Sequence, residues 1–211
     1  MPAASASSLR PRERARHARR AALLETAEQV FAERGFAGAT MAEIAARAGY
    51  SAGNLYNVFE GKEELYREVM LTGGKHVTEL LLGALRRPGS FRERLDGLID
   101  AFLGFGEKHR SFFVILSQPT GTFDWGTGAM TEEGDAIRDR IDHQLLSFFA
   151  QGAADGLISP GDSRVYMNLV SGALSAYVAD WIRRDGMPGE LWGDAGMLRA
   201  AMHRALGVKE P

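Results

Sequence analysis

Small and hydrogen-bonding side chains dominate the segment from Ser51 to Asn57, and no acidic residue interrupts them. A helix face in water normally carries charges of both signs, so this composition is typical of a face that meets another molecule. Short side chains let a helix approach base edges in the major groove of DNA, and an asparagine amide can pair with adenine through two hydrogen bonds. We therefore interpret the segment as a surface that reads double-stranded DNA. The alternative is that Tyr56 packs inside the protein.

The residues that would position this surface follow the pattern of two helices joined by a tight turn. Such a pair needs a small residue where the helices cross, a turn residue that accepts a positive φ, and apolar residues that hold the second helix in place. Ala45 and Gly49, followed by Leu55 and Val58, meet these needs in order. The spacing predicts a helix-turn-helix, although a helical hairpin inside any all-α core would show the same features.

A longer run of residues resembles the N-terminal signature of TetR-family transcriptional regulators over about residues 19 to 68. The matching positions are Phe31, Ala32, Glu33, Arg34, Gly35, Phe36, Thr40, Ile44, Ala45, Ala48, Gly49, Ser51, Gly53, Leu55, Tyr56, Phe59, Lys62, Glu63 and Leu65. The resemblance implies an all-α fold, in which a three-helix DNA-binding domain precedes a longer helical domain that dimerises and holds an effector pocket. It also implies repression that a ligand relieves.

The same resemblance implies roles for individual residues. The positions at which family members contact phosphates are Thr40, Ser51, Tyr56 and Lys62, and those that face bases are Ala52, Gly53, Asn54 and Asn57. Met41, beside Thr40, completes the predicted DNA-binding set. We also expect phosphate oxygens at the N-terminus of the helix that begins at Lys62, because free N–H groups and the helix dipole attract anions there. Tyr50 departs from the aliphatic residue that is commoner at this turn.

Positive charge is concentrated near the start of the chain. Between residues 10 and 20, six arginines stand against one glutamate, a local charge of +5 in a chain whose net charge is -2. The arginines are Arg10, Arg12, Arg14, Arg16, Arg19 and Arg20. A basic arm on an acidic body is typical of nucleic-acid contact, although a solvated tail has the same composition. We expect a flexible basic arm over 1–18, a helix-turn-helix domain over 19–68, and a helical effector-binding and dimerisation domain over 69–211.

Helical patterns continue through the second domain. Apolar residues at three- and four-residue spacing indicate helices over about 62–85, 90–106, 137–152, 162–184 and 198–206, and the apolar run 112–116 is interpreted as another helix. Capping boxes are expected at Thr40 with Glu43 and at Ser90 with Glu93. The glycine-rich segment 117–131 is expected to form a loop that acts as a lid.

Aromatic residues gather in the middle of the chain, where they would line an apolar cavity with a few polar anchors. The predicted effector-pocket residues are Phe102, Phe105, Phe112, Phe113, Trp125 and His143. An ordinary hydrophobic core is the alternative.

Small residues at helical spacing suggest a second kind of contact. The positions on the helix 162–184 are Leu169, Gly172, Ala173, Ala176, Tyr177 and Ala179. They permit close approach of a partner helix, which the apolar stripe of 198–206 would supply. Two such helices from each subunit would form a homodimer whose recognition helices lie one DNA turn apart, about 34 to 36 Å. An intrachain core is again the alternative.

The composition excludes several classes of protein. The 211 residues include no cysteine, so disulfides, thiolate metal sites and cysteine nucleophiles are excluded. We expect no metal and no cofactor. No apolar stretch approaches the length of a membrane span, and the basic N-terminal run is not followed by the apolar segment of a secretory signal. The expected location is the bacterial cytoplasm, in association with the nucleoid and without a membrane partner.

The leading interpretation is a sequence-specific transcriptional regulator, a homodimeric repressor that a small apolar or aromatic effector releases from a palindromic operator. One alternative is a sequence-tolerant architectural DNA-binding protein without an effector. Another is a helical hydrolase that uses His143 with Asp135 and Asp139, which recur every four residues. No nucleophile motif or glycine-rich phosphate loop accompanies these three residues, so we predict that the chain is not an enzyme.

Overall fold

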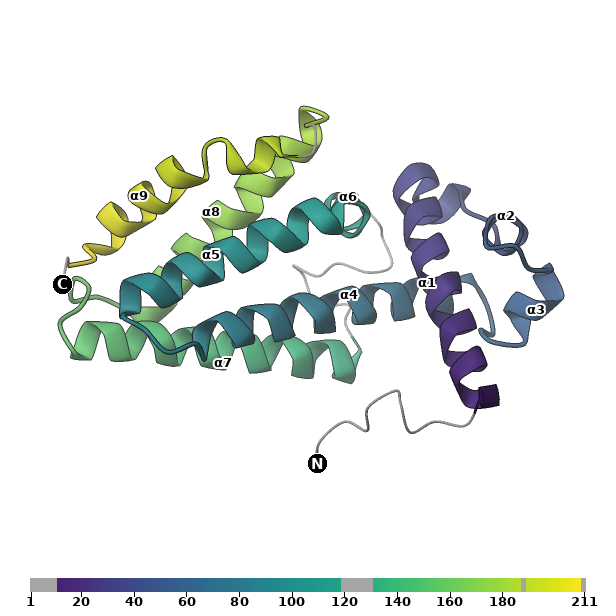
Figure 1. Ribbon diagram of the computed structural model, residues 1–211, viewed down its shortest axis with the longest axis horizontal. Helices are drawn as coiled ribbons and strands as arrows, with labels where there is room; N and C mark the ends of the chain where they lie inside the picture. The colour runs from purple at the N-terminus through teal and green to yellow at the C-terminus, as the bar shows by residue number, and fades with distance from the viewer. Residues whose placement is uncertain (1–10, 119–130, 187–188, 210–211) are drawn as a thin grey trace. The chain divides into compact units, whose positions relative to one another are not determined.

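The computed structural model of the chain describes residues 11–118, 131–186 and 189–209. Within these ranges every regular element is a helix, which confirms the predicted all-α fold (Figure 1). The helices are α1 (Pro11–Gly38), α2 (Met41–Arg47), α3 (Ala52–Tyr56), α4 (Lys62–Leu85), α5 (Phe91–Lys108), α6 (Arg110–Ser117), α7 (Glu132–Ala154), α8 (Ser163–Arg183), the short 3-10 helix η2 (Glu190–Trp192) and α9 (Ala195–Leu206). The chain divides into two compact units, Met1–Met70 and Leu71–Pro211.

The first unit is organised around α1. This helix begins at Pro11, whose fixed φ suits the first helical position. Its buried face recurs at three- and four-residue spacing and consists of Leu23, Ala27, Val30 and Phe31. Gly35 interrupts the helical geometry with a φ of 70°, which only glycine adopts at low cost. Because α1 begins at Pro11, residues 11–18 are helical and do not form the flexible arm that we expected. Arg10 lies outside the described residues.

The two predicted capping boxes differ in the structure. At the start of α5, the backbone N–H of Ser90 donates to the Glu93 carboxylate at 2.7 Å, and the Ser90 hydroxyl accepts the backbone N–H of Glu93 at 3.2 Å. The bond from the Ser90 backbone, with a further one from its hydroxyl, holds the pKa of Glu93 below its usual value because both favour the charged carboxylate. At α2, Thr40 accepts the N–H of Glu43 at 3.1 Å, but the Glu43 carboxylate pairs with Arg47 at 2.8 Å. The box at Thr40 is thus half formed.

The core of the second unit surrounds α5, which contacts α6, α8, α9 and η2. The buried residues of α5 are Phe91, Leu95, Leu98, Ile99, Leu103, Phe105 and Gly106. They cover an arc wide enough to meet several neighbours, as the apolar pattern predicted. The run 112–116 lies within α6, which confirms its interpretation as a helix.

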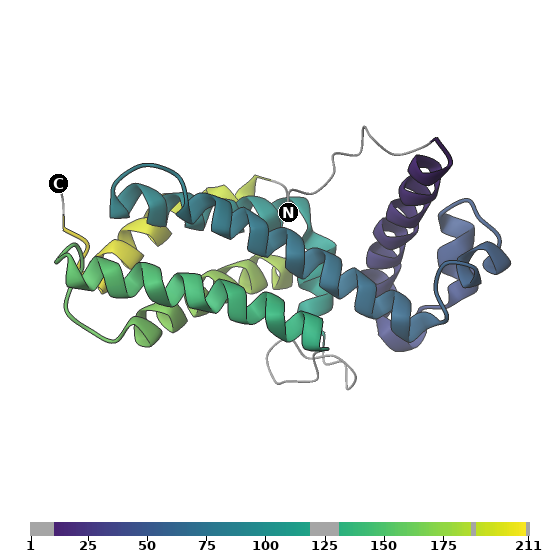
Figure 2. The same ribbon diagram turned by 90° about the horizontal axis from the view of Figure 1, so that it is seen from below.

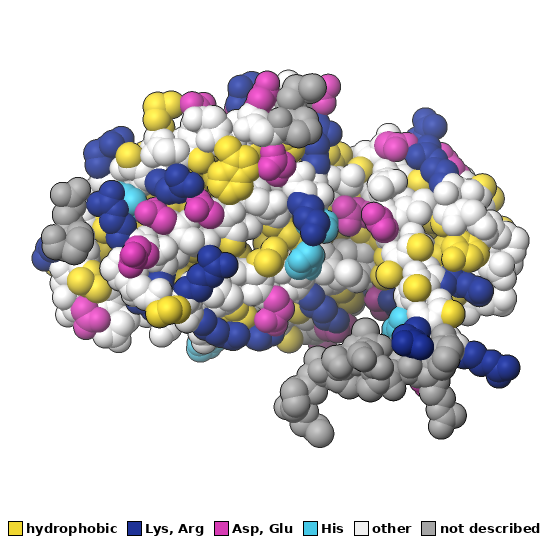
Figure 3. Space-filling view, viewed as in Figure 1, with side chains coloured by type: hydrophobic (Ala, Val, Ile, Leu, Met, Phe, Trp, Pro, Cys, Tyr) yellow, Lys and Arg dark blue, Asp and Glu magenta, His cyan; other side chains and the backbone are white. Residues whose placement is uncertain are grey.

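Helix α7 packs on α8 and also lies beside the part of α4 that belongs to the second unit (Figures 1 and 2). Two exposed ion pairs, Lys75 with Glu133 and Glu79 with Arg140, join α4 to α7. Exposed pairs of this kind contribute little to stability because water screens them. On the face of this unit drawn in Figure 3, Lys and Arg side chains alternate with Asp and Glu, so positive charge does not accumulate there.

The sequence pattern did not predict η2. Glu107 on α5 accepts hydrogen bonds from the backbone N–H of Gly189 and from Trp192 Nε1, the second at 2.8 Å, and so holds η2 against α5. None of the helices in the described ranges combines the length and the apolar character that a membrane crossing requires.

Candidate nucleic-acid interface

Helices α2 and α3 are joined by a four-residue turn whose geometry matches the sequence pattern. Gly49 has a φ of 77° although a Cβ there would meet no atom within 4 Å, so this glycine is needed for its backbone conformation and not for space. The N–H of Tyr50 donates to the carbonyl of Ala45 at 2.8 Å and closes the turn. Ser51 then begins α3 by accepting the N–H of Asn54 at 3.3 Å.

The outer side of α3 is open to solvent. Tyr56 is 55% exposed, Asn57 is exposed and Asn54 is half-buried, whereas Leu55 is fully buried and anchors the helix. Burial of Tyr56 was the alternative at the level of sequence, and the structure excludes it. The polar side chains at the end of α3 are therefore available to a partner.

Gly53 lies on this open side, and neither the backbone conformation nor the packing requires a glycine there. Its φ is not in the left-handed region, and a Cβ built on it would meet no atom within 4 Å. Glycine weakens a helix relative to alanine by roughly 1 kcal/mol. A glycine that neither the backbone nor the packing requires is consistent with close approach of an external molecule to α3.

Two members of the predicted contact set have intramolecular roles. Met41 is 6% exposed, so its side chain belongs to the core and is not available to DNA. Lys62 Nζ donates to the carbonyls of Ala39 at 3.0 Å and Ala37 at 3.4 Å, and it lies 4.6 Å from the ring centroid of Phe36. Lys62 thereby satisfies carbonyls that follow the break in α1. A contact between Lys62 and a phosphate stays a prediction. In such a contact the phosphate would share the ammonium group with these carbonyls and with the ring of Phe36.

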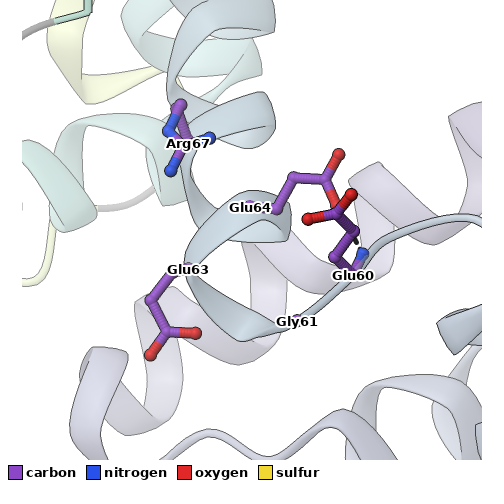
Figure 4. A pocket seen from close by; sticks show the side chains of 5 residues that line it. All are labelled: Glu60, Gly61, Glu63, Glu64 and Arg67. Carbon is purple, nitrogen blue, oxygen red and sulfur yellow. Dashed lines mark hydrogen bonds between the residues drawn. The ribbon is translucent and has the colours of Figure 1, made fainter.

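Acidic side chains surround the N-terminus of α4, where we expected phosphate oxygens, and that expectation stays a prediction. Glu60, Glu63 and Glu64, together with Arg67, line a hollow of about 490 Å³ at this end of the helix (Figure 4). The Glu64 carboxylate accepts the backbone N–H of Glu60 and so occupies a position in which an anion would be bound. The three carboxylates weaken the attraction of this helix end for a phosphate, whereas Arg67 opposes their effect.

Arginine side chains link α1 to the helix-turn-helix. Arg19 lies over the ring of Tyr50, 5.3 Å from its centroid, which explains how an aromatic residue is accommodated at this turn. On the other side of α2, Arg47 pairs with Glu33 on α1 and with Glu43. The hydrogen bond that Arg47 donates to the Glu33 carboxylate raises the pKa of Arg47, because it favours the charged guanidinium.

Four of the six predicted effector-pocket residues form one aromatic cluster in the second unit. The ring centroids of Phe102 and Phe113 are 5.3 Å apart, those of Phe105 and Phe112 are 5.7 Å apart, and those of Phe105 and Phe113 are 5.8 Å apart. Phe105 and Phe112 are buried, whereas Phe102 and Phe113 are half-buried. The cluster is thus partly core and partly accessible.

The other two predicted pocket residues do not join this cluster. Trp125 lies outside the described residues, as does most of the predicted lid. His143 is exposed on α7, as are Asp135 and Asp139, so these three residues form part of a solvated helix face. Sequence analysis missed His76, whose ring centroid lies 5.3 Å from that of Phe105. No spacing pattern could reveal this contact, because His76 comes from a different helix.

A short helix with an exposed surface free of acidic residues, held by a tight turn on a three-helix unit, defines a helix-turn-helix DNA-binding protein. Comparison with known families supports this class and extends it. Residues 23–69 match the family described as bacterial regulatory proteins, tetR family, and residues 88–190 match the tetracyclin repressor-like C-terminal domain. The chain belongs to the TetR family, and it is a transcriptional regulator and not an enzyme.

Two relatives of the chain are named for opposite effects on transcription, one as an activator and one as a repressor. The chain is 43% identical over 168 residues to the HTH-type transcriptional activator FasR of Mycolicibacterium smegmatis, with 72% of this chain and 74% of FasR covered. It is 34% identical over 99 residues to the HTH-type transcriptional repressor KstR2 of Mycobacterium tuberculosis, with 47% of this chain and 50% of KstR2 covered.

Two solved structures share the fold. FadR of Bacillus subtilis in complex with stearoyl-CoA has a TM-score of 0.71 and 18% identity, and the match covers 86% of this chain and 96% of FadR. AibR in complex with isovaleryl coenzyme A and operator DNA has a TM-score of 0.72 and 24% identity, and covers 90% of this chain and 100% of AibR.

Proposed function

We propose that this chain is a homodimeric, sequence-specific regulator that binds a palindromic operator on the bacterial chromosome, in the cytoplasm, and leaves it when a small apolar effector binds. The observation that carries the proposal is the exposed outer side of α3, where Tyr56 and Asn57 face solvent and no carboxylate is present. Neutral hydrogen-bonding groups on an exposed helix face suit base edges in the major groove.

Helix α8 supports the dimer. One face of this helix is buried in its own unit and consists of Tyr166, Met167, Val170, Leu174, Val178 and Trp181. The opposite face exposes Val165 at 61% and Leu169 at 42%, followed by Gly172 and Ala176. Apolar residues collected on one exposed helix face are typical of an interface. On α9, Met197 is 66% exposed and gives a second helix for a four-helix contact between two subunits.

The effector proposal rests on the aromatic cluster of Phe102, Phe105, Phe112 and Phe113. A partly exposed group of rings binds an apolar or aromatic ligand by removing its surface from water. The solved structures of FadR and AibR each contain an acyl coenzyme A, and an acyl chain is an apolar ligand of this kind. Acyl-CoA thioesters are therefore the first effectors to test.

The experiment that tests DNA recognition is selection of bound duplexes from a random pool by the full chain. We expect one palindrome, with half-site centres about 10 base pairs apart or a multiple of that, because two recognition helices must enter successive major grooves. The recovered duplex should compete about a thousandfold better than random DNA. Recovery of no shared sequence would contradict the proposal and favour the architectural alternative.

The effect of ligand is measured on the recovered duplex. We expect stearoyl-CoA or isovaleryl-CoA to lower the affinity of the chain for this duplex, as a ligand does when it prefers the conformation that does not bind DNA. Free coenzyme A is the matched control for the acyl group. A thioester that tightens binding would reverse the sign of the proposed ligand effect, and no effect of any acyl-CoA would contradict this effector class.

A further inference from the structure

A groove of about 600 Å³ lies along the first turns of α1, and its walls come from two parts of the first unit. One wall is a set of arginines on α1, and the other is formed by the two residues that follow α3. The residues that the argument uses are Arg12, Arg16, Arg19, Arg20, Asn57 and Val58.

Positive charge predominates on the α1 wall of the groove. Within the described part of the chain, no carboxylate pairs with Arg12, Arg16 or Arg19, whereas Arg20 pairs with Glu68 at 3.0 Å. A solvated helix face normally mixes both signs, and here three cations follow one another at helical spacing. The groove therefore has the electrostatic character of a site for a polyanion.

Aromatic rings orient two of these arginines. Arg19 lies over Tyr50 at 5.3 Å, and Arg20 lies over Phe59 at 5.0 Å from the ring centroid. Tyr50 belongs to the turn between α2 and α3, so the arginine wall and the recognition helix are held in one arrangement within the unit. Guanidinium groups that are already oriented lose less entropy when they bind an anion.

We propose that this groove binds backbone phosphates of the DNA strand that passes beside α3, an inference that rests on the proposed function. The wall from Arg12 to Arg19 extends about 10 Å along the helix axis, which is long enough to meet more than one phosphate of a strand. The remainder of this region offers little attraction, because residues 21–75 carry eight acidic and five basic side chains. The groove thus supplies the cationic contact that the helix-turn-helix itself lacks.

The groove also changes the role expected for Asn57. This residue ends α3 and lines the groove opposite the arginines. Its amide N–H groups donate to the same phosphates that the arginines bind. Asn57 thereby contacts the DNA backbone and fixes the position of α3 on the duplex. Asn54 and the surface around Gly53 are then the parts of α3 that contact bases.

Arg14 provides a matched control, because it carries the same charge on the same helix but does not line the groove. It lies about 200° around the helix from both Arg12 and Arg16. Binding of the full chain to the duplex recovered by selection is measured by fluorescence anisotropy at several salt concentrations. We expect Arg16→Gln, and separately Arg12→Gln, to reduce the slope of log affinity against log salt by about 0.9 each, and Arg14→Gln to leave it unchanged.

Equal effects of the three substitutions would overturn the proposal, because they would show a diffuse basic helix and not a groove. Circular dichroism checks that each variant keeps its helix content. If the unmodified chain shows no preference for any duplex, the proposed function fails. If the unmodified chain prefers the selected duplex but the three arginine variants have equal salt slopes, the proposed function stands and only the phosphate-binding groove is contradicted.

Asn57→Ala tests the second half of the proposal. We expect it to weaken binding to the recovered duplex and to all of its single-base variants by the same factor, because a phosphate contact carries no sequence information. Asn54→Ala serves as the comparison and is expected to relax the preference at one position of each half-site. A change of base preference caused by Asn57→Ala would overturn the assignment of Asn57 to the backbone.

Discussion

Phe112 lies so close to Gly73 that a Cβ on the glycine would overlap two carbon atoms of the ring. Gly73 belongs to α4, the helix that continues from the first unit into the second, and Phe112 belongs to the aromatic cluster proposed to bind an effector. Packed interiors transmit displacement because they contain little free space. A ligand that displaces Phe112 would therefore act directly on the backbone of α4.

The first prediction concerns this contact. Gly73→Ala places a methyl group against Phe112, and we expect a loss of about 1 to 3 kcal/mol in the free energy of unfolding, as for other overpacked sites. Gly83→Ala is the control, because Gly83 is exposed on the same helix and a Cβ there meets no atom within 4 Å. That variant should be unchanged or more stable by up to about 1 kcal/mol. Urea denaturation measures both, and equal stability of the two variants would contradict the packing.

The second prediction separates stability from binding at Gly53. Because a Cβ there meets open space, we expect Gly53→Ala to stabilise the protein by up to about 1 kcal/mol. The same methyl group should weaken binding to the selected duplex, since it would hold α3 away from DNA. Thermal denaturation and anisotropy measure the two effects, with Gly83→Ala as a variant that should leave DNA affinity unchanged. Unaltered affinity of Gly53→Ala would show that α3 does not approach DNA closely at this residue.

Local sequence patterns were sufficient to predict the helix-turn-helix. Gly49, Ser51 and Leu55 each act within a few residues of their own position, as a turn, a cap and an anchor, so their spacing carries the necessary information. The same holds for Ser90 and Glu93 at the start of α5. Local patterns failed where a distant partner competes, as at Glu43, whose carboxylate is taken by Arg47 and by Arg34 on α1.

Contacts between distant segments account for what the sequence did not reveal. The helical start at Pro11 turned the expected arm into one wall of a groove, whose other wall, including Asn57, lies some forty residues later. Lys62 was assigned to phosphate, yet it also bonds to the carbonyl of Ala39. Charge and spacing identify which residues are able to bind an anion, but only the packing of helices decides which of them share a surface.

The third prediction concerns pH. Because its hydrogen bonds with Ser90 lower the pKa of Glu93 in the folded protein, this carboxylate contributes stability that is present above the unfolded pKa of 4.5 and is lost as pH falls through the lower folded pKa. Ser90→Ala removes the hydroxyl and keeps the backbone N–H, which is the larger cause, so the pKa of Glu93 should rise only part of the way toward its usual value. The melting temperature should fall at neutral pH and change less at pH 3. NMR titration of the carboxyl and melting curves from pH 3 to 7 measure these changes. An identical pKa of Glu93 in Ser90→Ala and in the unmodified chain would contradict a contribution from the hydroxyl and leave the backbone N–H of Ser90 as the cause.

The last prediction tests the dimer at Gly172. This residue is exposed in the middle of α8, and a Cβ on it would meet no atom within 4 Å of its own subunit, so a partner helix has room to approach closely. Gly172→Glu would place a charge in that contact, and we expect a monomeric mass at micromolar concentration with helix content retained. Gly83→Glu introduces the same side chain at an exposed glycine of α4 and should leave the dimer intact.

Light scattering coupled to gel filtration gives the masses, and binding to the selected palindrome gives the functional consequence. A monomer holds only one recognition helix, so Gly172→Glu should bind the palindrome no better than an isolated half-site. A dimeric mass for Gly172→Glu would place the interface elsewhere. A monomeric mass for the unmodified chain would remove the reason for two half-sites, because one helix of the size of α3 reads only one major groove.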